Sequence, residues 1–177
     1  MMLKIAVLAT LFWITPLLLI GQTSDEHIIR VRLQEISIVD IEPSGDFTIS
    51  LETPTEAGRK MKSNVNSSKW INYTVSKKNA SNAGSISAQI VGVIPEGIDL
   101  ILNVGSAQGG GGETGIAIGE IELSSLPTEI ISGIGASYTG SGQGNGHNLS
   151  YELRVSDYNN LSKVESEVVT VMFTISQ

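Results

Sequence analysis

Residues 130–155 read IISGIGASYTGSGQGNGHNLSYELRV, and this stretch decides the fold. Its last seven residues alternate apolar and polar side chains, with the apolar positions at Leu149, Tyr151, Leu153 and Val155. Residues two apart on a strand share one face, so the pattern predicts an antiparallel strand with one buried face. The glycine-rich run before it ends in Asn145-Gly146, a pair that favours tight turns. We therefore expect a hairpin-like unit, in which a turn or flexible loop leads into a strand.

The same alternation recurs along the chain, separated by clusters of turn residues. The further runs cover residues 29–33, 36–41, 47–51, 71–75, 86–90, 98–104 and 169–175. No segment after residue 21 has sustained helical periodicity. Short strands at this spacing predict an all-β fold, which we interpret as a single antiparallel β-sandwich of about eight or nine strands with immunoglobulin-like architecture.

Three segments depart from this pattern. The alternation between residues 27 and 41 slips by one position at Glu35, which predicts a bulge or a break between two strands. Residues 53–68 are polar and are expected to form a loop. Residues 105–119 include four consecutive glycines, Gly109 to Gly112, and are expected to form a flexible loop with short strand pieces.

The first 21 residues have the pattern of a signal peptide. Lys4 precedes a long apolar run, and Gly21 is a small residue suited to a cleavage site. A retained membrane anchor is the alternative, but the run is short for a full span and polar residues follow it at once. We expect cleavage to leave residues 22–177 as one domain that is secreted, periplasmic or on the cell surface, with no membrane contact after cleavage.

Composition excludes several classes of function. The chain has no cysteine, which excludes disulfides, a lipoprotein anchor and thiolate metal sites. Without the leader it has ten basic and eighteen acidic residues. An acidic domain has no electrostatic attraction to nucleic acid or anionic lipid, so neither is an expected partner.

Neither catalytic nor cofactor motifs are evident. The glycine run before His147 lacks the following helix that a phosphate-binding loop requires. The two histidines, His27 and His147, are far apart, and we expect His147 to be an exposed, inert imidazole in a turn. The polar residues Asp157, Asn159 and Asn160 lack the spacing of a calcium loop, so we expect a solvated loop, with calcium binding as the open alternative. The chain is not expected to be an enzyme or to carry a cofactor.

Aromatic residues are the best candidates for ligand contacts. Flat rings stack on the apolar faces of sugars, and Trp70, Tyr138 and Tyr158 are the candidate ligand-binding residues. Aromatic residues make up only 5% of the chain, so anchors for a glycan are scarce. The competing interpretation is that Trp70 caps the edge of the core.

The layout resembles small exported bacterial β-sandwich surface proteins of the pilin-like, spore-coat-U-like and WxL-type group. The similar features are the leader, an opening strand IIRVRLQEISIVDI, the Trp-led strand WINYTV, the glycine run before LSYELRV, and a closing VVTVMFTIS. Asn72 stands where a WxL motif has leucine, and the cysteines common in coat-U-like and usher-type pilins are absent. No functional residue is therefore carried over. In style the chain is similar to Bacteroidetes-type secreted proteins.

These patterns lead us to expect a structural or adhesive surface module, such as a fibre or matrix subunit that assembles by β-strand addition. The expected donor lies in residues 27–41, and the expected acceptor edge is Val168–Ile175. The simpler alternative is that both strands pair within one monomer. Expected partners are further copies of the chain or other surface proteins, and the alternative function is a lectin-like module that binds a glycan.

Overall fold

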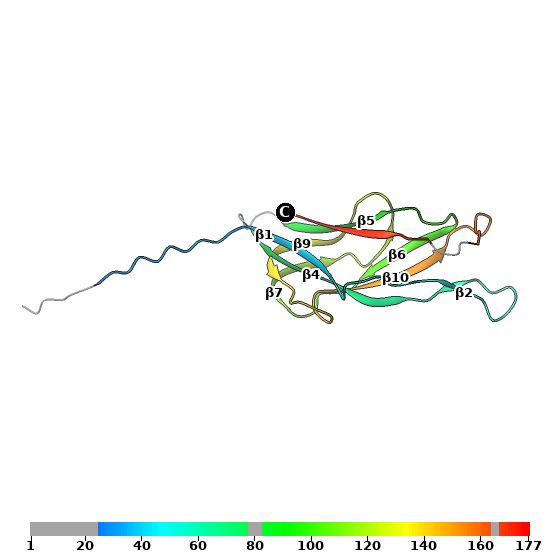
Figure 1. Ribbon diagram of the computed structural model, residues 1–177, viewed down its shortest axis with the longest axis horizontal. Coiled ribbons are helices and arrows are strands. Elements are labelled where there is room, and N and C mark those ends of the chain that lie inside the picture. The colour runs from blue at the N-terminus through cyan, green and yellow to red at the C-terminus, as the bar shows by residue number, and fades with distance from the viewer. Residues whose placement is uncertain (1–24, 78–82, 164–166) are drawn as a thin grey trace, which may run out of the picture. The chain divides into compact units, whose positions relative to one another are not determined.

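The computed structural model describes residues 25–77, 83–163 and 167–177 (Figure 1). The chain divides into two units, residues 1–32 and residues 33–177. The predicted leader, residues 1–21, and its cleavage site lie outside the described residues. In the first unit, residues 25–32 belong to no strand and every side chain is exposed.

The second unit is all-β, as the alternation predicts. The described residues contain no helix, and so none that is long and apolar enough to cross a membrane. They form eleven strands: β1 (Ile36–Glu42), β2 (Leu51–Glu52), β3 (Lys62–Ser63), β4 (Asn66–Ser76), β5 (Gly84–Val91), β6 (Ile98–Val104), β7 (Gly111–Ala117), β8 (Glu120–Leu123), β9 (Thr128–Tyr138), β10 (His147–Val155) and β11 (Thr170–Ser176).

Nine of these strands form one antiparallel sheet, and β2 and β3 form a separate ribbon. The sheet has two parts, β1-β4-β10-β6-β8 and β11-β5-β9-β7. The parts are joined where Thr74 and Val75 of β4 pair with Tyr138 and Ser137 of β9 (Figure 1). The predicted all-β antiparallel class is confirmed, and the number of strands in the main sheet lies in the expected range. The immunoglobulin-like sandwich stays a prediction.

Both parts of the sheet contribute to one core. Alternate residues are buried in β5 and in the first half of β10, as the sequence patterns predict, whereas β4, β6 and β9 also bury consecutive residues. The fully buried apolar side chains are Ile71 of β4, Ile86 of β5, Leu102 of β6, Ile130 and Ile131 of β9, and Leu149 of β10. Since these side chains come from both parts and form a single cluster, the two parts share one apolar interior.

The glycine-rich loop leads into a strand, as predicted, but residues 130–155 do not form a hairpin. β9 and β10 follow one another in the chain, but each pairs with β4 and not with the other. The connecting loop is held on β4: Thr139 donates its backbone N–H to Tyr73 O at 3.0 Å, and Asn72 Nδ2 donates to Asn145 O at 2.7 Å. β9 and β10 therefore lie end to end along the same edge of β4, the edge opposite β1, and the loop bulges out between them.

The expected flexible loop at residues 105–119 is also corrected, because it contains β7. Five of its seven residues are glycine, alanine or threonine, and β7 pairs with β9. Gly112 has φ of +82°, and a Cβ there would overlap the carbonyl oxygen of Ala136. The glycines therefore permit close approach of two backbones, which sequence composition alone does not distinguish from flexibility.

Two boundaries differ from the predictions. In the run 47–51 only Leu51 belongs to a strand, and Phe47, 36% exposed, packs on Tyr151 with ring centroids 5.0 Å apart. β4 begins at Asn66 rather than at Trp70, since Asn66 pairs with Tyr151 of β10.

Candidate functional site: an open seam between the first and last strands

β1 and β11 each have only one partner strand in the part of the chain that the structure describes. β1 pairs with β4, and β11 pairs with β5. The second edge of each strand therefore offers backbone groups to which another strand can bond. The two strands approach at one end, where Gln177 Nε2 donates to Ile36 O at 3.1 Å. We call the region between them the seam.

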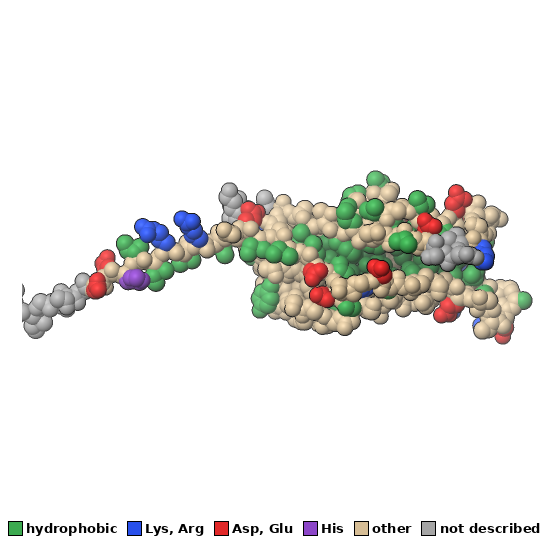
Figure 2. All heavy atoms as spheres, in the orientation of Figure 1, with side chains coloured by type: hydrophobic (Ala, Val, Ile, Leu, Met, Phe, Trp, Pro, Cys, Tyr) green, Lys and Arg blue, Asp and Glu red, His purple; other side chains and the backbone are tan. Residues whose placement is uncertain are grey.

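The core is incompletely covered along the seam. Five core-facing side chains of the two strands are only half-buried, namely Val39 and Ile41 of β1 and Val171, Phe173 and Ile175 of β11. The corresponding side chains of the inner strands are fully buried. Figure 2 shows hydrophobic side chains in a band along the face on which β11 runs in Figure 1. The seam is therefore an apolar surface flanked by two unpaired strand edges.

The segment before β1 has the exposed apolar alternation that a strand needs to fill the seam. Ile29, Val31 and Leu33 alternate with charged or polar residues, and their exposed fractions are 74%, 87% and 83%. The predicted donor at residues 27–41 is corrected at its C-terminal end, because β1 pairs with its own β4 from Ile36 onwards. Within the predicted donor, only residues 27–35 remain outside any strand. The slip at Glu35 marks this boundary in the sequence.

The three predicted ligand-binding aromatics are not brought together. Trp70 is half-buried on the outer face of β4, directly between Glu42 of β1 and Asn148 of β10. Tyr138, 57% exposed, lies opposite Thr74, four residues further along β4 and hence about 13 Å from Trp70 at the usual rise.

Tyr158 lies elsewhere, in the loop after β10. Its side chain is 50% exposed, and its hydroxyl accepts a hydrogen bond from the backbone of Met61 at 3.1 Å. Tyr158 therefore fastens this loop to the region of β3. It lies in a different part of the domain from Trp70 and Tyr138.

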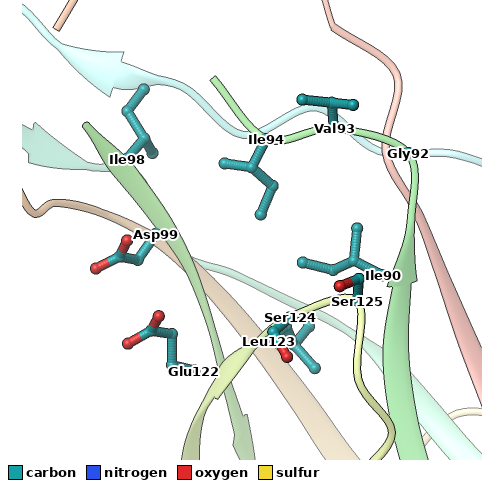
Figure 3. Close-up of a pocket in the computed structure, with 10 residues that line it drawn as sticks. All are labelled: Ile90, Gly92, Val93, Ile94, Ile98, Asp99, Glu122, Leu123, Ser124 and Ser125. Carbon is teal, nitrogen blue, oxygen red and sulfur yellow. The ribbon is translucent and has the colours of Figure 1, made fainter. Parts of the chain in front are cut away.

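A shallow hollow of about 300 Å³ lies between β5, β6 and β8 (Figure 3). Ile90, Ile94, Ile98 and Leu123 give it an apolar lining, and Asp99 and Glu122 lie together at one side. None of the predicted aromatics lines it. Among the described residues, no three His, Cys, Asp or Glu side chains gather in a way that could hold a metal ion.

The Asp157 loop is held by its own hydrogen bonds. Asp157 Oδ1 accepts from the backbone N–H and from Nδ2 of Asn159, and its Oδ2 accepts from Asn160 Nδ2, at 2.9 to 3.0 Å. The carboxylate oxygens that a calcium ion would need are thus engaged by neighbouring amides. The geometry is that of a turn stabilised by an aspartate.

His147 is buried, so the predicted exposed imidazole is wrong. The ring is fully covered at the start of β10 and stacks on Tyr73. Its Nδ1 donates to Gly105 O at 2.8 Å. Its Nε2 lies 2.9 Å from the Tyr73 hydroxyl, which donates to Thr114 O. The network links β4, β7 and β10, and it gives His147 a structural role.

We expect this network to make folding stability dependent on pH. Burial lowers the pKa of His147 from its ordinary 6.5, against opposing hydrogen bonds from the Gly105 and Thr114 backbone. The folded state then binds fewer protons than the unfolded state below that value, so stability falls as pH drops through 6.5 toward the lower folded pKa, by up to about 1.4 kcal/mol per pH unit. Urea unfolding at about pH 7 and about pH 5 measures this loss, and His147→Gln is expected to reduce it. Equal losses of stability in the wild type and in His147→Gln would contradict the role of His147 in this pH dependence.

Comparison of the chain with protein-family models, with curated proteins and with solved structures finds no match.

Proposed function

We propose that this protein is an exported structural or adhesive surface module that assembles by β-strand addition. In this assembly, residues 28–34 of one copy enter the seam of another copy. The observation that carries the proposal is the pairing of two complementary features in one chain: an apolar seam with half-buried core residues, and an exposed segment that alternates apolar and polar side chains.

Length supports the fit. β1 and β11 each have seven residues, and residues 28–34 are also seven. At about 3.3 Å per residue this segment spans roughly 23 Å, which is the length of the seam strands. Since β1 and β11 already meet at the Ile36 end, the segment pairs along the rest of the seam.

The free energy expected from burial of the segment is also large enough to support assembly. Ile29, Val31 and Leu33 are largely exposed, and full burial of such side chains contributes about 1.5–3 kcal/mol each. Main-chain hydrogen bonds to the two strand edges add affinity, as in other cases of β-strand addition. Against this stand the costs of association and of ordering the segment, several kcal/mol or more, so we expect reversible assembly at micromolar concentrations or below.

The test is size-exclusion chromatography with light scattering on residues 22–177 over a range of concentrations. We expect the mass to grow with concentration into ladders or fibres. A chain that lacks residues 22–33 keeps nearly all of the second unit, and we expect it to be a folded monomer by circular dichroism at every concentration. A monomeric full-length chain, or a shortened chain that unfolds, would contradict the proposal.

Glycan binding remains the second candidate, and the surroundings of Trp70 favour it. The half-buried indole lies between a carboxylate, Glu42, and an amide, Asn148, which are groups that bond sugar hydroxyls. Trp70 fluorescence during addition of polysaccharides tests this candidate. Unchanged fluorescence, together with no binding on glycan arrays, would rule it out.

A further inference from the structure

The outer face of β1 carries two carboxylates at strand spacing. Asp40 and Glu42 lie on the face opposite to the half-buried Val39 and Ile41. Asp40 accepts only the backbone N–H of Ile41 at 2.8 Å, and neither carboxylate takes part in an ion pair among the described residues. The edge of β1 that borders the seam is therefore negatively charged on its outer side.

The entering segment carries two cations at the same spacing. Arg30 and Arg32 alternate with Ile29, Val31 and Leu33, and both are exposed without a carboxylate partner among the described residues. When the three apolar side chains face the core, both guanidinium groups lie on the outer face of the new strand.

We propose that Arg30 and Arg32 of the entering copy pair with Glu42 and Asp40 of the receiving copy, and that these pairs fix the register and polarity of assembly. This inference rests on the proposed strand addition. In an antiparallel arrangement, facing side chains on neighbouring strands are about 4.5–5.5 Å apart at Cβ, which lets Arg32 face Asp40 while Arg30 faces Glu42.

The same register aligns the apolar faces. With Arg32 opposite Asp40, Val31 lies beside Ile41 and Leu33 lies beside Val39, so the half-buried residues of β1 gain apolar neighbours. Two of the three apolar side chains then lie beside apolar residues of β1, and Ile29 lies opposite Pro43, just past the end of that strand.

Charge is needed because apolar alternation alone does not define the register. A slip of one residue is excluded, since it would turn Arg30 and Arg32 into the core. A slip of two residues leaves every side chain on its original face of the strand. Its free-energy cost is then the loss of an ion pair. The outward side chains of β11 are uncharged, namely Thr170, Met172, Thr174 and Ser176, so β1 alone supplies the charges.

The charges also explain how copies of an acidic domain come together. Residues 33–177 have sixteen acidic and eight basic residues, so two such domains repel each other. Arg30 and Arg32 bring positive charge to the point of contact, and they lie in the segment rather than in the domain.

Charge reversal followed by mixing tests the inference. One full-length variant carries Arg30→Glu and Arg32→Glu, and a second carries Asp40→Arg and Glu42→Arg. We expect each alone to assemble roughly tenfold more weakly, because two exposed ion pairs become like-charge pairs. An equimolar mixture is expected to recover wild-type assembly, since the Glu segment of the first variant fits the Arg edge of the second, and the native Arg segment of the second fits the native acidic edge of the first. Light scattering measures all three samples.

The outcomes separate this inference from the proposed function. If each variant assembles as the wild type does, or if both are weakened and mixing fails to restore assembly, strand addition stands and the charge pairing is overturned. If the wild-type chain itself remains monomeric, strand addition fails and the pairing fails with it. Recovery on mixing excludes a general folding defect, because neither chain has been restored to its native sequence.

Discussion

Replacement of Ile29 by aspartate is expected to weaken assembly at least a hundredfold and to leave the folded domain unchanged. Ile29 is 74% exposed in the single chain and contributes nothing to its core. In the seam of a second copy it faces the apolar interior, where an unpaired carboxylate costs several kcal/mol. A loss of about 3 kcal/mol corresponds to roughly a hundredfold in affinity. Light scattering over a concentration series measures the change.

Ile28 provides a matched control on the opposite face of the same segment. It is also isoleucine, its exposed fraction is 78%, and its side chain faces outward when Ile29 faces the core. Ile28→Asp introduces the same charge at the neighbouring position, and we expect it to change assembly less than about tenfold. If the two variants lose assembly equally, or if neither does, the segment does not enter the seam as a strand with one buried face.

Much of the fold follows from period-two alternation in the sequence. β5, β6, β10 and β11 lie where apolar residues recur every second position, because one face of each strand covers the common core. The strand break at Glu35 could also be predicted, since a one-residue slip in the apolar alternation cannot occur within a regular strand. Within β1 the prediction of the apolar positions is wrong, because Ile36 and Ile38 lie on the exposed face with Asp40, while Val39 and Ile41 pack on the core.

The alternation could not predict which strands pair with one another or how deeply each side chain is buried. Alternation defines the faces of β10 but not its neighbour. β9 and β10 lie end to end on one edge of β4, where loop hydrogen bonds to Tyr73 and Asn72 hold the chain. Nor does the sequence reveal that Val171 and Phe173 stay half-buried while Ile86 is fully covered. That difference depends on which strands end the sheet. The candidate seam is therefore a property of topology, while the entering segment is visible in the sequence.

Substitution of Gly146 by alanine is expected to destabilise the domain by about 3 kcal/mol or more. Gly146 directly precedes His147, is buried, and has φ of +73°. An added Cβ would overlap the backbone carbonyl oxygen of Ile71 and would lie 2.8 Å from Asn72 Nδ2. Ile71 lies in the middle of β4, paired on both sides, so its backbone cannot yield without disturbing β1 and β10. Urea unfolding measures the loss.

Gly144→Ala separates the steric effect from the cost of a left-handed backbone. Gly144 lies two residues earlier in the same loop with φ of +83°, and an added Cβ there meets no atom within 4 Å. Only the backbone penalty applies, so we expect a loss of about 1 kcal/mol. A large difference between the two variants means that this loop is pressed against β4 and sets where β10 begins. Equal losses would mean instead that the loop can move off β4, and that β10 and its buried His147 are positioned by strand pairing alone.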